Sequence, residues 1–305
     1  MPASAMARAL RAYVRHAPGT LGKARLVAGF LDEHLRTHPL DANVRLRCGD
    51  RVAVATGDFI QRVQYQFGEW EPNLSAFLRA RLQPGDTFID VGAHRGAFSL
   101  LASHLVGPQG RVLAVEPCPP FHHALTCAAA VNHRTNIRAV RVAASDSAGT
   151  LTLYLENPAN LGHTTAVRPG DFHESFQVTT GSLADLADPT ELATARIIKI
   201  DVEGAEAAVV RGLLPALPQM REDVELVIEV TPRLLAKQGE AAADIVDTLR
   251  EQGFHAYTLA NDYDPATYPQ AIRRPQPPVR CTEIPKEMSD MVFSRTAAHR
   301  LAIEL

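Results

Sequence analysis

The chain has 305 residues, with 31 Lys and Arg against 34 Asp and Glu, so its formal net charge is −3. Hydrophobic residues make up 46% and charged residues 21%, which is typical of a globular protein and excludes a disordered, collagen-like or coiled-coil chain. The charge balance argues against affinity based mainly on nucleic-acid phosphates, and no uncharged apolar run approaches the roughly 18 residues needed to span a bilayer. We therefore expect one large or two smaller domains, with no nucleic-acid partner and no membrane span.

The four cysteines contain no CxxC pair and no zinc-ligand spacing, which favours a reduced, cytoplasmic setting. Residues 1–31 carry five basic side chains and no acidic one. They do not form a secretory signal, because charges interrupt any apolar stretch, although a transit peptide has a similar composition. We favour a basic helical extension that packs on the main domain or on a partner subunit, so a homo-oligomer stays open.

The first part of the chain predicts an extension ahead of the main fold. Residues 5–38 have loosely helical spacing of apolar side chains. From Asn43 to Phe67 the pattern alternates, with turn signals, and predicts a small antiparallel element. A helix is expected from residue 71 to about 82, with proline in its first turn.

From Thr87 onward, apolar strands alternate with helices, which predicts a parallel sheet with right-handed crossovers. The expected strands are 87–91, 111–115, 137–142, 196–200 and 224–230, and the expected helices are 96–105, 121–131, one from 205, and 241–252. Residues 254–259 and 291–294 predict a closing antiparallel pair. The polar stretch 155–177 is expected to be irregular, and the proline-rich, basic stretch 263–285 to be a loop over one edge of the site.

The strongest local motif is the run from Phe88 to Gly96. An apolar strand ends near an acid, turns at Gly92 and enters a helix at Gly96. The glycines are spaced G-x-x-x-G rather than G-x-G-x-x-G, and Asp90 stands two residues before the first. A diphosphate favours helix-end N–H groups without a neighbouring carboxylate, whereas a cofactor with an amino group and a sulfonium cation suits Asp90.

The next two strands also end in polar residues. Glu116 lies 20 residues beyond Gly96, near the spacing at which an acid binds a ribose diol. The third strand is followed by Ala144, Ser145 and Asp146, where a short polar side chain can bond an adenine amino group. A surface carboxylate for Glu116 and a structural turn for Asp146 are the alternatives.

These motifs resemble the class I S-adenosylmethionine-dependent methyltransferases and, more closely, the FkbM family. The resemblance rests on Trp70-Glu71-Pro72, Asp90-Val91-Gly92-Ala93, Val115-Glu116-Pro117, the strand Leu151–Tyr154 and above all the run Ile198–Glu206. It implies a Rossmann-like α/β fold with a seven-stranded, mostly parallel sheet, S-adenosylmethionine as cofactor, and O-methylation of a small-molecule hydroxyl on a sugar, polyketide or related product. The cofactor-binding residues that it implies are Asp90, Gly92, Ala93, His94, Gly96, Glu116, Pro117, Ala144, Ser145, Asp146 and Asp201. His94-Arg95 and Ala144-Ser145-Asp146 depart from the usual family residues.

Acidic residues after the fourth strand are the candidates for catalysis. Glu203 is the preferred general base and Asp201 the second, since crowded carboxylates raise at least one pKa. We expect Glu206 to begin the next helix, and Glu229 completes the acidic cluster. His163 is a candidate acceptor contact, with an exposed loop histidine as its alternative. Oxygen-rich sites suit magnesium, but the spacing is not diagnostic, so no metal is assigned.

The expected division is an extension over 1–68, a methyltransferase domain over 69–298 and a tail over 299–305. Three other functions stay open: a non-catalytic S-adenosylmethionine-binding scaffold, a nicotinamide-dependent oxidoreductase, and methylation of nitrogen or of a macromolecule.

Overall fold

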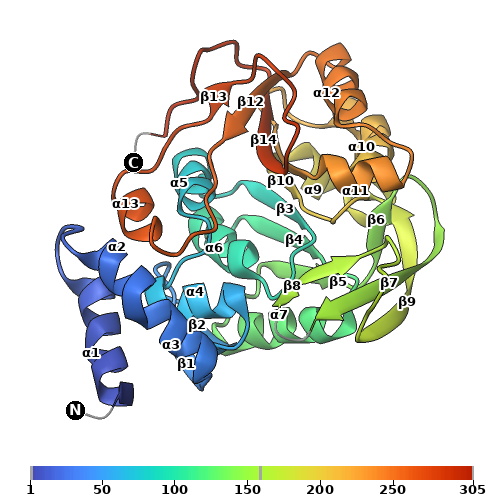
Figure 1. Cartoon of the computed structure of the whole chain (residues 1–305). Coiled ribbons are helices and arrows are strands. Elements are labelled where there is room, and N and C mark those ends of the chain that lie inside the picture. Colours follow the sequence, from blue (N-terminus) through green and yellow to red (C-terminus); the bar gives the residue numbers. More distant parts are fainter. Residues whose placement is uncertain (1–2, 158–159, 304–305) are drawn as a thin grey trace.

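The computed structural model describes residues 3–157 and 160–303, and for residues 3, 4, 156, 157 and 160–163 it describes the backbone alone. One sheet of eight strands lies at its centre, in the order β13-β12-β14-β11-β10-β3-β4-β5 (Figure 1). The strands are β3 (Thr87–Val91), β4 (Arg111–Val115), β5 (Ile137–Val140), β10 (Ala195–Ile200), β11 (Glu225–Val230), β12 (His255–Leu259), β13 (Val279–Arg280) and β14 (Ser289–Ser294).

Five neighbouring strands of this sheet are parallel, and the antiparallel pairing is confined to one end. β5, β4, β3, β10 and β11 pair in parallel, whereas β14 is antiparallel to both β11 and β12. The expected α/β sheet of seven mostly parallel strands with an antiparallel closing pair is confirmed. The two-residue strand β13 adds an eighth member at the edge.

Helices cover both faces of the sheet. Successive side chains of a strand point to opposite faces, and here both sets are apolar, so each face packs against its own layer of helices. Ile89 and Val91 pack with α10 and α12, whereas Phe88 packs with Phe77 of α5 and Leu101 of α6. All three strand residues are fully buried, as is usual in parallel sheets. Between residues 72 and 251 the helices are α5 (Pro72–Arg81), α6 (Ala97–Val106), α7 (Pro119–Val131), α8 (Leu183–Leu186), α9 (Pro189–Ala193), α10 (Glu206–Leu213), η2 (Leu214–Gln219), α11 (Pro232–Lys237) and α12 (Ala242–Glu251).

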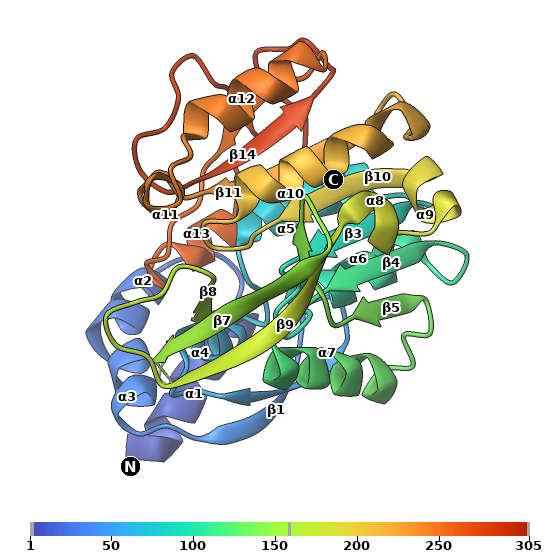
Figure 2. The same ribbon diagram turned by 90° about the vertical axis from the view of Figure 1, so that its right-hand side faces the viewer.

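A second sheet replaces the irregular stretch predicted for 155–177, so that prediction is wrong. Its strands are β6 (Ala143–Ser145), β7 (Gly149–Asn157), β8 (Asn160–Thr165) and β9 (Glu174–Ser182), in the order β6-β9-β7-β8. Figure 2 shows β7 and β9 as a separate layer beside the main sheet. Leu153 packs with Val178 on one face only, so the exposed face is polar and the segment resembles a loop in sequence.

The N-terminal segment is helical, as expected, and then forms a hairpin. Its elements are α1 (Ala3–His16), α2 (Lys23–Leu26), the π-helical turn η1 (Val27–Leu31), α3 (Asp32–Thr37), β1 (Asp41–Arg45) and β2 (Arg51–Ala55). The prediction of strand up to Phe67 is wrong, because Phe59–Phe67 forms helix α4. The Asp58 carboxylate caps this helix by accepting from Gln61 N at 2.9 Å, and Gly68 ends it in the left-handed conformation.

The loop predicted over 263–285 contains helix α13 (Tyr268–Arg273) and strand β13. Tyr268 is fully buried and stacks on Phe67 at a ring distance of 5.1 Å, so α13 packs on the N-terminal segment. Near the C-terminus, Leu301 is buried in the main core. Within the described part of the chain, no helix is long and apolar enough to cross a membrane.

The turn after β3 needs a glycine for two separate reasons. Gly92 has φ of 79°, and a Cβ there would lie 1.8 Å from the backbone oxygen of Asp201. Gly253 has a similar φ of 82°, but a Cβ there would have no heavy atom within 4 Å beyond its chain neighbours. Comparing substitutions at Gly92 and Gly253 therefore distinguishes the cost of a left-handed backbone from the cost of a steric clash with the neighbouring backbone.

We expect Gly92→Ala to lower the free energy of unfolding by about 2 to 4 kcal/mol, and Gly253→Ala by about 1 kcal/mol. The first change adds a steric clash to the backbone strain, whereas the second adds the strain alone. Urea unfolding followed by fluorescence of the single tryptophan measures both. Equal losses in the two variants would contradict the close approach.

Candidate active site

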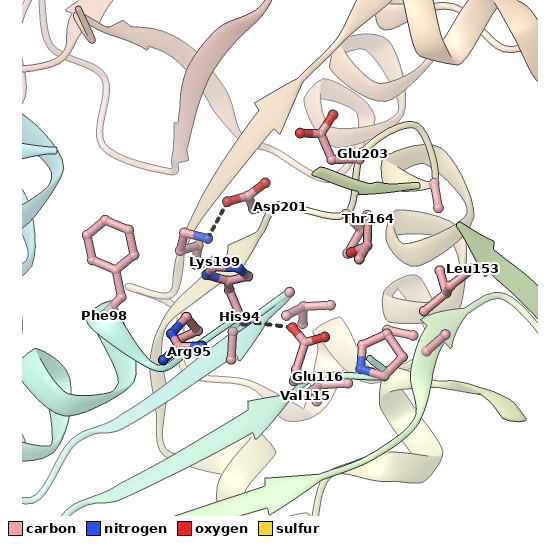
Figure 3. A pocket seen from close by; sticks show the side chains of 18 of the residues that line it. His94, Arg95, Phe98, Val115, Glu116, Leu153, Thr164, Lys199, Asp201 and Glu203 are labelled. Atoms are coloured by element: carbon pink, nitrogen blue, oxygen red, sulfur yellow. Dashed lines mark hydrogen bonds and ion pairs between the residues drawn. The ribbon is translucent and has the colours of Figure 1, made fainter. Parts of the chain in front are cut away.

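A cavity lies where β3, β4 and β10 end, between the two sheets (Figure 3). The main sheet contributes the turn after β3, the end of β4 and the end of β10, which is the edge where open α/β sheets bind ligands. The second sheet contributes Leu151, Leu153 and Thr164, and the N-terminal segment contributes Ile60 and Gln64 of α4. Three parts of the fold thus enclose one site.

The turn from β3 to α6 forms the floor of this cavity. Gly92, Ala93 and His94 line it, and His94 has a positive φ of 51°. Gly96 precedes α6 in the left-handed conformation, and the Asp90 carboxylate accepts a backbone hydrogen bond from Ser99 in the first turn of this helix. His94 also packs edge-on against Phe121, at a ring distance of 4.1 Å.

Glu116 is a buried carboxylate in the cavity wall, at the end of β4. Its Oε2 accepts from His94 N at 2.7 Å, and its Oε1 accepts from Cys118 N at 2.8 Å. Burial raises the pKa of Glu116 to about 7, although these two hydrogen bonds oppose the shift. Pro117 lines the cavity next to it.

Asp90 lies beneath the cavity and is not part of its wall. It is 1% exposed, and its Oδ2 accepts from Ser99 Oγ at 2.6 Å. Its Oδ1 is buried without a hydrogen-bond partner and lies 3.9 Å from Lys199 Nζ. Burial raises the pKa of Asp90, against the effect of Lys199.

Asp201 and Glu203, the predicted catalytic acids, both line the cavity beyond the end of β10. Asp201 Oδ2 accepts from Lys199 Nζ at 2.8 Å, so one oxygen of the half-buried Asp201 is held by an ion pair with a buried lysine. Glu203 has a positive φ of 48°, which is rare for a residue with a side chain, and Thr165 Oγ1 bonds its carbonyl oxygen at 3.1 Å. In Figure 3, Asp201 lies between Lys199 and Glu203.

More carboxylates are buried behind the cavity. Glu229 accepts from Tyr263 OH at 2.9 Å, and Glu71 is within 3.4 Å of the same hydroxyl. Burial, followed by the charge of Asp201, raises the pKa of Glu229 to about 10, so Glu229 is protonated at neutral pH. Burial raises the pKa of Asp290 to about 6. Glu229 thus belongs to the acidic cluster without lining the cavity.

Of the residues predicted to bind the cofactor after the third strand, only part lies at the cavity. Ala144 lines the cavity, whereas Ser145 and Asp146 do not. The carboxylate of Asp146 accepts from Arg211 Nε at 3.0 Å on the surface. This partner favours the structural alternative for Asp146 over adenine recognition.

His163 and Glu206 are the remaining residues that the sequence analysis singled out near the site. The side chain of His163 lies outside the described residues, and only its backbone is placed, in β8. Glu206 begins α10 as expected, and its Oε1 accepts from Gly204 N at 2.8 Å. Burial raises the pKa of Glu206 to about 7. Within residues 3–157 and 160–303, no group of three His, Cys, Asp or Glu side chains is arranged to hold a metal ion.

Several residues of the cavity wall were not predicted from the sequence. Lys199 carried a signal, since a lysine between Ile198 and Ile200 in a buried strand needs a charged partner. Trp70 and Gln64 carried none, because their place depends on how the N-terminal segment packs.

The sequence profile of the Methyltransferase FkbM domain matches residues 90–256, which is more than half of the chain. The chain belongs to the FkbM methyltransferase family. It is therefore a methyltransferase that uses S-adenosylmethionine, and the nicotinamide-dependent alternative is set aside.

Two curated proteins and one solved structure illustrate the similarity. The 31-O-demethyl-FK506 methyltransferase FkbM of Streptomyces tacrolimicus is 31% identical over 214 residues, which cover 60% of this chain and 77% of that protein. Methyltransferase 1 of Beauveria bassiana is 27% identical over 202 residues, covering 60% and 78%. The crystal structure of methyltransferase FkbM from Methylobacillus flagellatus is 14% identical, with a TM-score of 0.38, covering 76% and 53%.

Proposed function

We propose that this enzyme transfers a methyl group from S-adenosylmethionine to a hydroxyl oxygen of a small molecule. The observation that carries the proposal is the pair of carboxylates, Asp201 and Glu203, in the wall of the cavity that also holds Glu116. The S. tacrolimicus relative is named for a substrate that lacks an O-methyl group, which supports oxygen as the acceptor atom. Enclosure by the second sheet and α4 favours a small molecule over a macromolecule.

The cavity residues fit the methyl donor. A carboxylate has about four lone-pair positions, and Glu116 uses two of them for backbone N–H groups. Two positions are left for the two donors of a ribose diol. Ala144 and Leu153 offer an apolar wall for the adenine ring, and Gly92 adds no side chain to the floor. When bound, S-adenosylmethionine supplies an electrophilic methyl group on a sulfonium cation.

The chain's own residues align the acceptor and take its proton. Methyl transfer is an in-line displacement: the oxygen–carbon bond forms, the carbon–sulfur bond breaks, and S-adenosylhomocysteine leaves. The hydroxyl proton passes to a carboxylate, and we assign this role to Glu203. Asp201 is the second choice, since Lys199 holds one of its oxygens. The sulfur loses its positive charge while the carboxylate gains a proton, so the net charge of the site is unchanged.

We expect the affinity of the wild type for S-adenosylhomocysteine to fall as the pH drops through about 7, and Glu116→Gln to remove this dependence. The pKa of Glu116 is raised to about 7, so above that pH the charged carboxylate accepts from the ribose, and below it one acceptor position is lost. At pH 8, Glu116→Gln is expected to weaken binding about 10- to 100-fold, the range of a charge-assisted hydrogen bond. Titration calorimetry from pH 6 to 8 measures both effects.

Glu206→Gln is the matched control for that experiment. Glu206 is also buried with its pKa raised to about 7, but it is not part of the cavity wall. The pH dependence of binding is expected to survive in this variant. Its loss in Glu206→Gln, or its survival in Glu116→Gln, would contradict the ribose assignment.

We expect Glu203→Gln to lower kcat about 100-fold, the lower end of the range for a general base, with little change in affinity for S-adenosylhomocysteine. Release of that product during incubation with S-adenosylmethionine and a panel of alcohols, phenols and amines measures turnover. Glu251→Gln, on the exposed side of α12, is the control with unchanged activity. Equal turnover in Glu203→Gln and wild type would move the base elsewhere, and methylation of amines alone would contradict an oxygen acceptor.

A further inference from the structure

A cluster of cations lies where the N-terminal segment meets helix α13, and none of its members lines the cavity described above. Figure 1 shows α2 beside both α1 and α13. The members of this cation cluster, from α1, α2, the turn after β1 and the end of α13, are Arg11, Arg15, Lys23, Arg47 and Arg273. Burial and then the charges of four members lower the pKa of His16, so these cations converge on one place.

Lys23 is the most enclosed member of the cation cluster. It is 5% exposed, and its Nζ donates to the carbonyl oxygen of Ala17 at 2.6 Å. The charged groups that act on it are Arg47 and Arg273, and burial followed by these two charges lowers its pKa. A lysine is rarely buried unless it is paired with an acid. An ammonium group has three N–H donors, so Lys23 has two left for a ligand.

Arg15 also has a donor left over. Its guanidinium group lies against Gly68, where there is no side chain, and Nη2 donates to the carbonyl oxygen of Arg45. Nη1 is buried and makes no hydrogen bond within the described part of the chain. Burial, followed by the charges of Arg11 and Arg47, lowers the pKa of Arg15 to about 10. The group is still charged at neutral pH.

The fold balances only part of this positive charge. Arg11 Nε donates to the carbonyl oxygen of Tyr65 at 2.7 Å, near the end of α4, where the helix dipole supplies roughly half a negative charge. Within residues 3–157 and 160–303, Glu69 is the one acid in ion-pair contact with the cluster. Its Oε2 is 3.4 Å from Arg47 Nε, and its Oε1 is taken by Arg79 at 2.5 Å. Several positive charges therefore stay without a counter-charge from these residues.

The chemistry of the donors favours a phosphate group. A guanidinium group and an ammonium group that face one place suit an anion with several acceptor oxygens. A phosphate monoester has three such oxygens and carries about −1.5 to −2 charges at neutral pH, whereas a carboxylate has two oxygens and one charge. Binding of the more highly charged anion relieves more of the repulsion among the cations.

We propose that the cation cluster binds a phosphate group of a small soluble molecule, with Lys23 Nζ and Arg15 Nη1 as donors and Arg47 as a further positive charge. Free phosphate and a phosphate monoester share this chemistry. The inference concerns a second site on the enzyme, so it does not depend on the methyl donor, the acceptor or the general base.

Titration calorimetry of the full-length enzyme tests the proposal at constant ionic strength. The probes are phenyl phosphate, inorganic phosphate and benzoate, which separate an ester, the free anion and a carboxylate. The variants are Lys23→Met and Arg15→Gln, with Arg25→Gln as the matched control. Arg25 lies on the same short helix as Lys23, but it is exposed and does not belong to the cluster.

We expect phenyl phosphate to bind the wild type at least 10-fold more tightly than benzoate. Lys23→Met and Arg15→Gln are each expected to weaken phenyl phosphate about 10- to 100-fold, the range of a charge-assisted hydrogen bond, and Arg25→Gln to leave its affinity unchanged. Inorganic phosphate is expected to lose affinity in the same two variants. The tighter of the two phosphate probes tells whether the site suits the ester or the free anion.

Urea unfolding shows whether a loss of binding comes from a loss of folding. In phosphate-free buffer, Lys23→Met is expected to keep the urea midpoint of the wild type or to raise it, because the change removes a buried cation that repels its neighbours. Excess phenyl phosphate is expected to raise the midpoint of the wild type and of Arg25→Gln, but not that of Lys23→Met.

Four results would overturn the inference. The first is a wild type that binds neither phosphate probe, and the second is equal affinity for phenyl phosphate and benzoate. The third is an equal loss of affinity in Arg25→Gln and Lys23→Met, which would mean that the general surface charge attracts the anion. The fourth is binding to phosphatidylglycerol vesicles without binding to phenyl phosphate, which would assign the cluster to a membrane surface.

Discussion

The close approach of two strand-end turns is the constraint on which the site depends. Gly92 has no side chain, so the turn after β3 lies directly against the backbone of Asp201 after β10, and Asp201 N donates to Val91 O at 3.0 Å. This contact brings the acids that follow β10 over the floor that follows β3. A Cβ at position 92 would clash with the backbone oxygen of Asp201 and force the floor after β3 away from the turn that carries Asp201 and Glu203.

The acids around this contact lie in surroundings that disfavour their charged forms. Buried carboxylates with raised pKa values, such as Glu116 and Glu229, lower stability relative to groups left in water. One cation, Lys199, offsets the acids nearest to it, and Glu229 keeps its proton. A site that binds a sulfonium cation benefits from this excess of acid, whereas a stable core would not. The cost in stability is thus consistent with a catalytic role.

The main sheet could be predicted from sequence because its signals are local. Apolar strands such as Thr87–Val91 alternate with helices, and the acids and glycines at the strand ends follow from the parallel arrangement. The second sheet could not, since β7 and β9 pair across a long polar segment and bury one face only.

The cavity could likewise be predicted only where its residues follow from local sequence signals. Glu116, Asp201 and Glu203 stand at predicted strand ends, whereas Gln64 and Thr164 reach the site through long-range packing. Asp90 is predicted as a cofactor contact, yet it lies one layer below the cavity wall, because the depth of a side chain depends on its neighbours.

A crystal structure of the enzyme with S-adenosylhomocysteine shows whether the cavity between the two sheets holds the methyl donor. We expect the ribose on the Glu116 carboxylate, the adenine ring against Ala144 and Leu153, and the sulfur directed towards Glu203. Density for the ligand outside this cavity, or a ribose without contact to Glu116, would contradict it.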